Sequence, residues 1–275
     1  MTDQAAKAAR FRKCHRPGDP LLVPNPWDAG SARLFESLGF QALATTSSGF
    51  AATLGRLDGS VTRDEALAHA AAIVSATELP VTADLENGFA DTLDGVAETA
   101  RGAVAVGLAG FSVEDYTGDE GDPIYELAHA AERVRAAAEV AHDDAVRLVL
   151  TARAENYLHG RRDRADTIAR LQAYQEAGAD VLYAPGPTDA ATLKAIISCV
   201  DRPVNVLARP GAPAVAELAE LGVSRISVGG ALAFVAIEAA TTAAIELRDH
   251  GTYGFLERSA AGVMAVREAF RDRPF

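Results

Sequence analysis

The chain has 275 residues, of which 49% are hydrophobic and 23% are charged, and its formal net charge is −12. This composition is typical of a globular protein and excludes a disordered or collagen-like chain. The negative charge argues against nucleic acid or an anionic membrane surface as a partner. A local cluster of basic residues could still bind a small anionic substrate.

Signals for other compartments are missing from the sequence. Cys14 and Cys199 are too few for a disulfide framework or a zinc cluster. The N-terminal segment has no apolar region typical of a secretory signal, and no run of about 18 apolar residues predicts a membrane span. We therefore expect a cytoplasmic protein with no membrane partner.

Short apolar runs alternate with helix-period segments along most of the chain. The runs predict eight strands, at Leu21–Asn25, Gln41–Thr45, Val81–Leu85, Gly110–Val113, Arg147–Ala152, Asp180–Ala184, Pro203–Leu207 and Arg225–Val228. The clearest helices between them are predicted at Arg63–Glu78, Thr92–Val106, Glu126–Ala141, Arg164–Ala177 and Ala214–Leu221. Thr62 and Glu65 fit a capping box at the start of the first of these helices.

Alternation of this kind predicts parallel strands joined by right-handed crossovers. Eight such units in about 230 residues match a closed (β/α)8 barrel, the TIM-barrel fold. An open doubly wound sheet is the alternative, but no GxGxxG motif opens the first helix. We expect one barrel domain over residues 1–275, with an N-terminal lead at 1–20. A C-terminal helical tail at 251–275 is expected to pack under the barrel or on a neighbouring subunit.

Acidic residues follow the third and fourth predicted strands, where the chemistry of a barrel is usually located. Asp84 and Glu86 stand two residues apart, so in a strand both would project to one side, and Glu114 would add a third acid. Crowded carboxylates repel each other unless a cation or a shared proton intervenes. Oxygen ligands without His or Cys favour Mg²⁺, with Mn²⁺ as an alternative, over zinc. The competing interpretation is a set of solvated loop acids.

Other strand ends carry candidate ligands for an anion. Arg153 could bind a carboxylate or phosphate with two N–H groups, or it could close salt bridges around the rim. The segment Thr46–Ser48 offers hydroxyl groups and backbone amides to an oxyanion. Asn205, in an apolar strand, could contact a ligand or tie strands together.

Several mechanisms are disfavoured by the residues that are missing. None of the lysines, Lys7, Lys13 and Lys194, lies on a predicted strand, which argues strongly against Schiff-base catalysis. Neither cysteine is a convincing nucleophile. His159, in the loop YLHGRRD, is the one histidine that could approach the expected barrel mouth.

Together these segments resemble the isocitrate lyase / phosphoenolpyruvate mutase superfamily, in particular its oxaloacetate decarboxylase-like and methylisocitrate lyase-like members. The resemblance covers roughly residues 20 to 250. It is carried by NPWDAGSARLFESLGF, ATTSSGFAATLGRLDG, VTADLENGF, FSVEDYTG, TARAENYL and PVNVLARPG.

This resemblance implies a (β/α)8 barrel whose last helix is swapped between the subunits of a homodimer or homotetramer. It implies Asp84 as a direct Mg²⁺ ligand, and Glu86, Asp58 and Glu114 as acids that hold the water molecules of the metal. Arg153 matches the arginine that binds the substrate carboxylate. The residues Thr46, Ser47 and Ser48 match the loop around the 2-oxo acid, and Asn205 matches a polar residue of the seventh strand.

The loop after the fourth strand departs from the superfamily pattern. Lyases of the superfamily carry a Lys-Lys-Cys-Gly-His loop there, whereas this chain reads EDYTGDEGDPIYELA. We expect an Mg²⁺-dependent enzyme that cleaves a C–C bond of a small 2-oxo carboxylate through an enolate, as a lyase or decarboxylase. The alternatives are a non-catalytic 2-oxo acid binding protein and a phosphonopyruvate-type P–C bond mutase or hydrolase.

Overall fold

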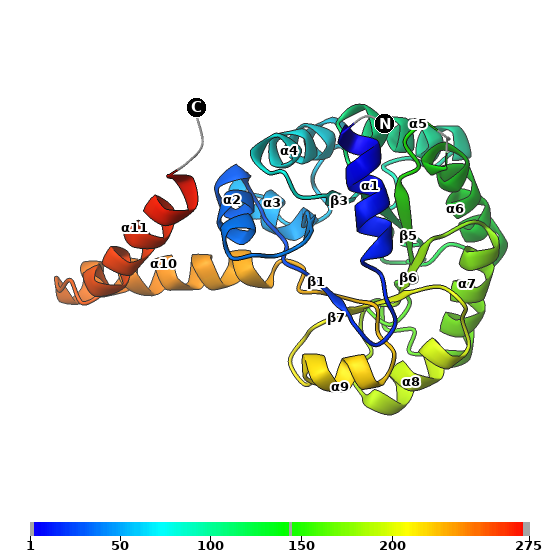
Figure 1. Cartoon of the computed structure of the whole chain (residues 1–275). Coiled ribbons are helices and arrows are strands. Elements are labelled where there is room, and N and C mark those ends of the chain that lie inside the picture. Colours follow the sequence, from blue (N-terminus) through cyan, green and yellow to red (C-terminus); the bar gives the residue numbers. More distant parts are fainter. Residues whose placement is uncertain (1–2, 143–144, 272–275) are drawn as a thin grey trace.

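A computed structural model describes residues 3–142 and 145–271, and its eight strands form one parallel sheet that curls into a nearly closed barrel (Figure 1). The order of strands is β1-β8-β7-β6-β5-β4-β3-β2. A backbone hydrogen bond of 3.1 Å from the Ala44 amide to the Pro24 carbonyl links the two ends of the sheet. The predicted (β/α)8 fold is therefore confirmed.

The strands are β1 (Leu21–Val23), β2 (Leu43–Ala44), β3 (Val81–Asp84), β4 (Gly110–Glu114), β5 (Val149–Arg153), β6 (Val181–Tyr183), β7 (Val204–Leu207) and β8 (Arg225–Ser227). The helices of the barrel are α2 (Ala29–Ser37), α3 (Ser47–Thr53), α4 (Arg63–Ala76), α5 (Leu93–Ala105), α6 (Leu127–Ala141), α7 (Arg164–Glu176), α8 (Ala190–Ser198) and α9 (Val215–Glu220). Every strand overlaps its predicted run. Strands β4 and β5 extend one residue beyond the prediction, to Glu114 and Arg153, which pair in register.

Local sequence explains how these elements begin and pack. Thr62 and Glu65 form the predicted capping box of α4, with the Thr62 amide 2.9 Å from the Glu65 carboxylate. Gly110 opens β4 where the chain is crowded, because a Cβ there would lie 2.6 Å from the Val149 carbonyl and 3.1 Å from the Phe11 ring. Only glycine allows this close approach at the amino end of the barrel.

The N-terminal lead contains a helix that was not predicted from the sequence. It forms helix α1 (Asp3–Lys13), which packs with the buried Phe11 against the amino ends of β4 and β5. Just after α1, the buried His15 donates from Nδ1 to the Phe11 carbonyl oxygen at 2.9 Å, and its Nε2 faces Arg225 Nη1 at 3.4 Å. The lead therefore closes the end of the barrel opposite to the strand carboxyl ends.

His15 makes the stability of the fold depend on pH. Burial lowers the pKa of His15 from 6.5 to about 3, so below pH 6.5 the unfolded chain binds a proton that the folded chain does not. The free energy of unfolding should fall as the pH drops from about 6.5 toward 3, by at most ~1.4 kcal/mol per pH unit from this group. In His15→Gln, which cannot be protonated, urea unfolding at pH 7, 6 and 5 should show a shallower fall. Equal pH slopes in the two proteins would contradict this assignment.

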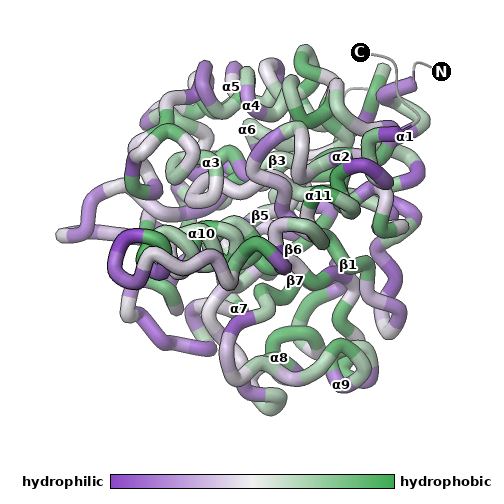
Figure 2. Tube along the Cα trace, turned by 90° about the vertical axis from the view of Figure 1, so that its left-hand side faces the viewer, coloured by the Kyte–Doolittle hydropathy of each residue, from purple (hydrophilic) through white to green (hydrophobic). Residues whose placement is uncertain are grey.

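Two helices follow the barrel: α10 (Ala231–His250) extends away from it, and α11 (Leu256–Phe270) turns back toward it (Figure 1). Helix α11 does not pack under the barrel but lies beside α2, where Arg33 stands 5.9 Å from the ring centroid of Phe270. Hydrophobic residues run along both helices (Figure 2), and many are exposed, among them Phe234, Val235, Ile237, Ile245, Leu247, Leu256, Val263, Met264 and Val266. Residues 272–275 of the predicted tail lie outside the described residues. Within the described ranges, no helix has the length and apolar character needed to cross a bilayer.

Candidate functional site

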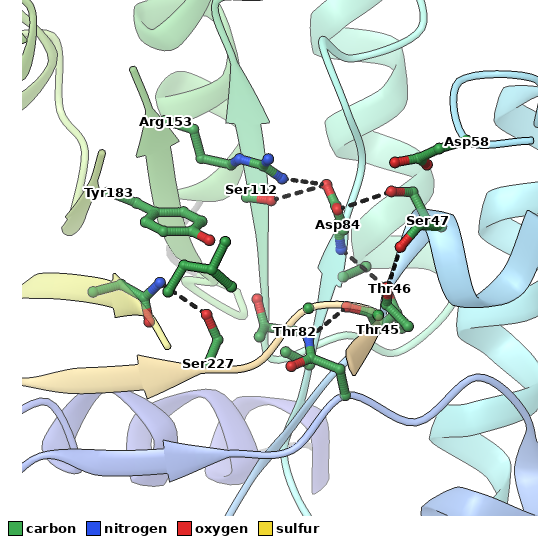
Figure 3. A pocket seen from close by; sticks show the side chains of 18 of the residues that line it. Thr45, Thr46, Ser47, Asp58, Thr82, Asp84, Ser112, Arg153, Tyr183 and Ser227 are labelled. Carbon is green, nitrogen blue, oxygen red and sulfur yellow. Dashed lines mark hydrogen bonds and ion pairs between the residues drawn. The ribbon is translucent and has the colours of Figure 1, made fainter. Parts of the chain in front are cut away.

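A cavity of about 220 Å³ opens at the carboxyl ends of the strands, where the sequence predicts the chemistry to lie (Figure 3). All but two of the predicted site residues line it, namely Thr46, Ser47, Ser48, Asp58, Asp84, Arg153 and Asn205. Glu86 lines a small adjoining pocket with Ser47 and Asp84, and Glu114 contacts Arg153. The structure therefore brings seven of the nine predicted residues together around one cavity.

Arg153 connects three carboxylates. Its Nη1 donates to Asp84 Oδ1 at 2.9 Å, its Nη2 lies 3.1 Å from Glu114 Oε2, and its Nε donates to Glu155 Oε1 at 2.8 Å. The face of the Tyr183 ring lies 5.2 Å from the guanidinium carbon. The three ion pairs correspond to the predicted rim salt bridges, and the cavity position corresponds to the predicted ligand-binding role. The two interpretations of Arg153 are thus compatible.

Electrostatics in this cluster are dominated by burial. Burial would lower the pKa of Arg153, but the carboxylates of Glu114, Glu155 and Asp84 outweigh it and raise that pKa. Burial raises the pKa of Glu114 well above its usual range, against the opposing effect of Arg153. Burial also raises the pKa of Glu155. The acids outnumber the single arginine, so the site holds protons or attracts a further cation.

Asp84 is the last residue of β3, and its two carboxylate oxygens differ in how many hydrogen bonds they accept. Its Oδ1 accepts from Arg153, from the Glu86 amide at 3.2 Å and from Ser112 Oγ at 3.5 Å. Its Oδ2 accepts only from Ser47 Oγ, at 3.2 Å, among the described residues. This oxygen faces the cavity beside Asp58, which reaches over from the loop between α3 and α4 (Figure 3).

Glu86 reaches the site by a route that strand alternation does not describe. Strand β3 ends at Asp84, and Glu86 lies in the following turn with a left-handed φ of 47°. Its Oε1 is buried and has no hydrogen-bond partner among the residues that the structure describes. Burial, followed by the charges of Asp84 and Asp58, raises the pKa of Glu86 to about 8. A non-glycine residue held in this conformation with an unsatisfied oxygen is typical of a functional position.

The Glu86 turn is clamped from behind by Arg133 of α6. This buried guanidinium donates to the carbonyl oxygens of Asn87, Ala90 and Asp91, at 2.5, 2.8 and 3.2 Å. Arg133 therefore fixes the loop that carries Glu86 and acts as a positioning residue.

The segment Thr46–Ser48 begins helix α3 and does not form an open loop. Thr46 caps this helix by accepting from the Gly49 amide at 3.3 Å, and it lies 3.2 Å from Ser48 Oγ. Ser47 points instead to Asp84. The three hydroxyl groups therefore face one side of the cavity.

Asn205 is a buried residue that lines the cavity from β7. Its Nδ2 donates to Ser227 Oγ at 3.1 Å and its Oδ1 accepts from Arg225 Nε at 2.8 Å. It therefore ties β7 to β8, as one of the two interpretations predicted, while it also lines the cavity. Tyr183, its neighbour across the sheet, also lines the cavity, and burial raises its pKa to about 12.

Four residues of the site, Ser112, Glu155, Tyr183 and Arg225, were not among the predicted site residues. Ser112 stands two positions before Glu114 in β4, so strand alternation could have placed it on the same face. Tyr183 and Arg225 lie within predicted strands, but nothing in a single strand shows which polar side chains point into the barrel. His159 does not line the cavity and stacks on Tyr116 at 4.1 Å.

The residues present fit a divalent cation. Within the described ranges, no three His, Cys, Asp or Glu side chains converge as a complete ligand set. Mg²⁺ does not need such a set, because it usually keeps several water molecules and takes one or two carboxylates from the protein. The open Oδ2 of Asp84, the unpartnered Oε1 of Glu86 and the excess of acids provide the required hard oxygen donors.

The fold is a TIM barrel, and acidic residues surround Arg153 at its cavity. A family model described as phosphoenolpyruvate phosphomutase matches residues 11–248. The chain therefore belongs to the phosphoenolpyruvate mutase family, within the superfamily that the sequence motifs resemble.

Individual relatives agree with this assignment. An uncharacterized protein of Mycobacterium tuberculosis is 32% identical, over 87% of this chain and 89% of that protein. An oxaloacetate decarboxylase of Chromohalobacter salexigens is 30% identical over 87% and 84%, and the 2-methylisocitrate lyase of Escherichia coli is 30% identical over 70% and 67%. The crystal structure of a protein from Burkholderia cenocepacia J2315, provisionally described as a lyase/mutase, is 49% identical and covers 100% of this chain and 98% of that chain, with a TM-score of 0.94.

Proposed function

We propose that the protein is an Mg²⁺-dependent enzyme, with Mn²⁺ as an alternative metal, that cleaves a C–C bond of a small 2-oxo carboxylate through an enolate, as a lyase or decarboxylase. The observation that carries the proposal is the Arg153 cluster at the cavity. There a single guanidinium contacts three carboxylates, so the negative charge exceeds the positive charge. Relatives named as an oxaloacetate decarboxylase and a 2-methylisocitrate lyase support the same chemistry.

Arg153 would bind the carboxylate of the substrate. Its three ion pairs use one N–H each, and a guanidinium has five, so Nη1 and Nη2 retain donors for a ligand in the cavity. The hydroxyl groups of Thr46 and Ser48 would donate to the same end of the substrate, and Asn205 would line its far side.

Asp84 and Glu86 would hold the metal ion, with Asp58 and Glu114 ordering its water molecules. A divalent cation there would supply positive charge beside the keto oxygen of the substrate, which favours the enolate. The raised pKa of Glu86 indicates that this acid keeps a proton until a cation replaces it.

Tyr183 is the best-placed proton donor in a chain that lacks the cysteine loop of the lyases. Its hydroxyl group lines the cavity, and its raised pKa keeps it protonated at neutral pH. After the C–C bond breaks, the hydroxyl would give its proton to the enolate carbon, and water would restore the proton to the phenolate oxygen.

Proton exchange measured by NMR tests this function. With Mg²⁺ in D₂O, we expect the protein to speed deuterium incorporation at C3 of pyruvate, and to speed the decarboxylation or cleavage of a larger 2-oxo acid. Tyr183→Phe should slow the exchange by roughly 10²- to 10⁴-fold. Metal-dependent binding of pyruvate and oxaloacetate without exchange or cleavage would instead favour a non-catalytic binding protein.

We also propose that the apolar faces of α10 and α11 are covered in a homodimer or homotetramer, with the last helix exchanged between subunits. The exposed Val235, Ile245 and Met264 on these helices support this arrangement, because contiguous exposed apolar surface usually marks an interface.

A further inference from the structure

The floor of the cavity is formed by a buried arginine that belongs to neither the acid cluster nor the predicted site. Arg225, the first residue of β8, is only 5% exposed and lines the same cavity as Asp84 and Arg153. Its Nε donates to Asn205 Oδ1 at 2.8 Å, its Nη2 donates to Thr151 Oγ1 at 3.1 Å, and its Nη1 lies 3.4 Å from His15 Nε2.

Every one of these partners is neutral. Asn205 and Thr151 carry no charge, and burial lowers the pKa of His15 to about 3, so its imidazole is uncharged at neutral pH. In the part of the chain that the structure describes, no carboxylate forms an ion pair with Arg225. Burial accordingly lowers the pKa of Arg225 to about 10; Tyr183 opposes this effect, the charge of Arg153 adds to it, and no carboxylate contributes.

An isolated charge is costly inside a protein. Arg133, which does not line the cavity, donates to three backbone carbonyl oxygens, and two other arginines pair with carboxylates. Arg153 contacts three carboxylates, and Arg170 pairs with Asp115 at 3.1 Å. Arg225 has no carboxylate partner among the described residues. Because it lines the cavity, an anion bound there could contact it. Its three contacts use one N–H each, so donors of the five-donor guanidinium remain.

We propose that Arg225 forms an anion-binding subsite on the cavity floor, which takes the second carboxylate of a dianionic 2-oxo acid whose first carboxylate binds at Arg153. This inference rests on the proposed function for its substrate class. The spacing is suitable, because Thr151 stands two residues before Arg153 on β5, which separates the two levels by roughly 7 Å. A four-carbon dicarboxylate can bridge such a separation, whereas pyruvate cannot.

A matched pair of ligands isolates the second carboxylate. Oxaloacetate and 2-oxobutanoate have the same carbon skeleton up to the terminal group, which is a carboxylate in the first and a methyl group in the second. Binding of each is measured with Mg²⁺ by stopped-flow fluorescence of Trp27, the single tryptophan, before oxaloacetate decays. In Arg225→Met, the Kd of oxaloacetate should rise roughly 10- to 100-fold, and that of 2-oxobutanoate should stay within about twofold.

Thr151→Val is the control variant. It removes a neutral partner of Arg225 but keeps the cation, so the ratio of the two Kd values should remain that of the natural protein. If Arg225→Met leaves the ratio unchanged, Arg225 only ties the N-terminal lead to the barrel and the inference is wrong. If Arg225→Met does not fold, crystals of the natural protein soaked with malonate decide, because a carboxylate against Arg225 supports the subsite and its absence there refutes it.

The proposed function can fail separately from this inference. Tight, Arg225-dependent binding of oxaloacetate without any proton exchange or cleavage would leave the subsite standing and remove the enzymatic proposal. Turnover of oxaloacetate with an unchanged Kd ratio in Arg225→Met would support the enzymatic proposal and refute the subsite.

Discussion

Asp84→Asn should abolish the metal-dependent reaction while leaving the barrel folded. The substitution keeps the shape of the side chain but removes the charge of a carboxylate whose Oδ2 has a single hydrogen-bond partner among the described residues. A lost metal ligand should reduce the rate by roughly 10³-fold or more. Arg153 keeps its ion pairs with Glu114 and Glu155, so the thermal unfolding temperature should change little.

The measurement combines calorimetric titration with Mg²⁺, the NMR exchange assay and thermal unfolding. Asp58→Asn is the matched control, because Asp58 comes from an exposed loop and is expected to contact only the water molecules of the metal. It should weaken Mg²⁺ binding by roughly tenfold and leave measurable activity. If Asp84→Asn binds Mg²⁺ and exchanges protons as the natural protein does, the metal lies elsewhere and the assignment of Asp84 fails.

The sequence predicted the barrel because its signals are local and repeated. Apolar runs, helix-period segments and capping residues such as Thr62 each report on a few neighbouring positions, and eight repetitions leave little choice of fold. The site could be predicted as far as it follows the strand ends, which is why Asp84, Glu114 and Arg153 were identified together. Their ion pairs were not predictable in detail, because they depend on the register between β3, β4 and β5.

Other features depend on information that a single segment does not contain. Glu86 was predicted to follow strand alternation, yet it enters the site from a left-handed turn fixed by Arg133 of another helix. The sequence around Arg225 indicates only the start of a strand. Its position in the cavity depends on β5, β7 and the N-terminal lead, which contact it in the fold. Helix α10 has a helix-forming composition but was not among the predicted helices, because the predicted helical tail began only at Gly251.

Arg153→Lys should weaken binding of the 2-oxo acid and destabilise the protein at the same time. Lysine keeps the positive charge but offers a single ammonium group where the guanidinium reaches three separate carboxylates. Glu114 and Glu155 would lose part of their compensation in a buried environment. We expect the Kd of the 2-oxo acid to rise roughly 10- to 100-fold and the free energy of unfolding to fall by about 1–3 kcal/mol.

Arg161→Lys provides the control for this change of side chain. Arg161 pairs with Asp122 at 3.0 Å on the exposed rim of the barrel, and such pairs contribute little to stability. Ligand titration and urea unfolding of the two variants should therefore separate clearly, with Arg161→Lys close to the natural protein. A variant Arg153→Lys that is destabilised but binds the 2-oxo acid with unchanged Kd would show that Arg153 only organises the acids, and that another group binds the substrate carboxylate.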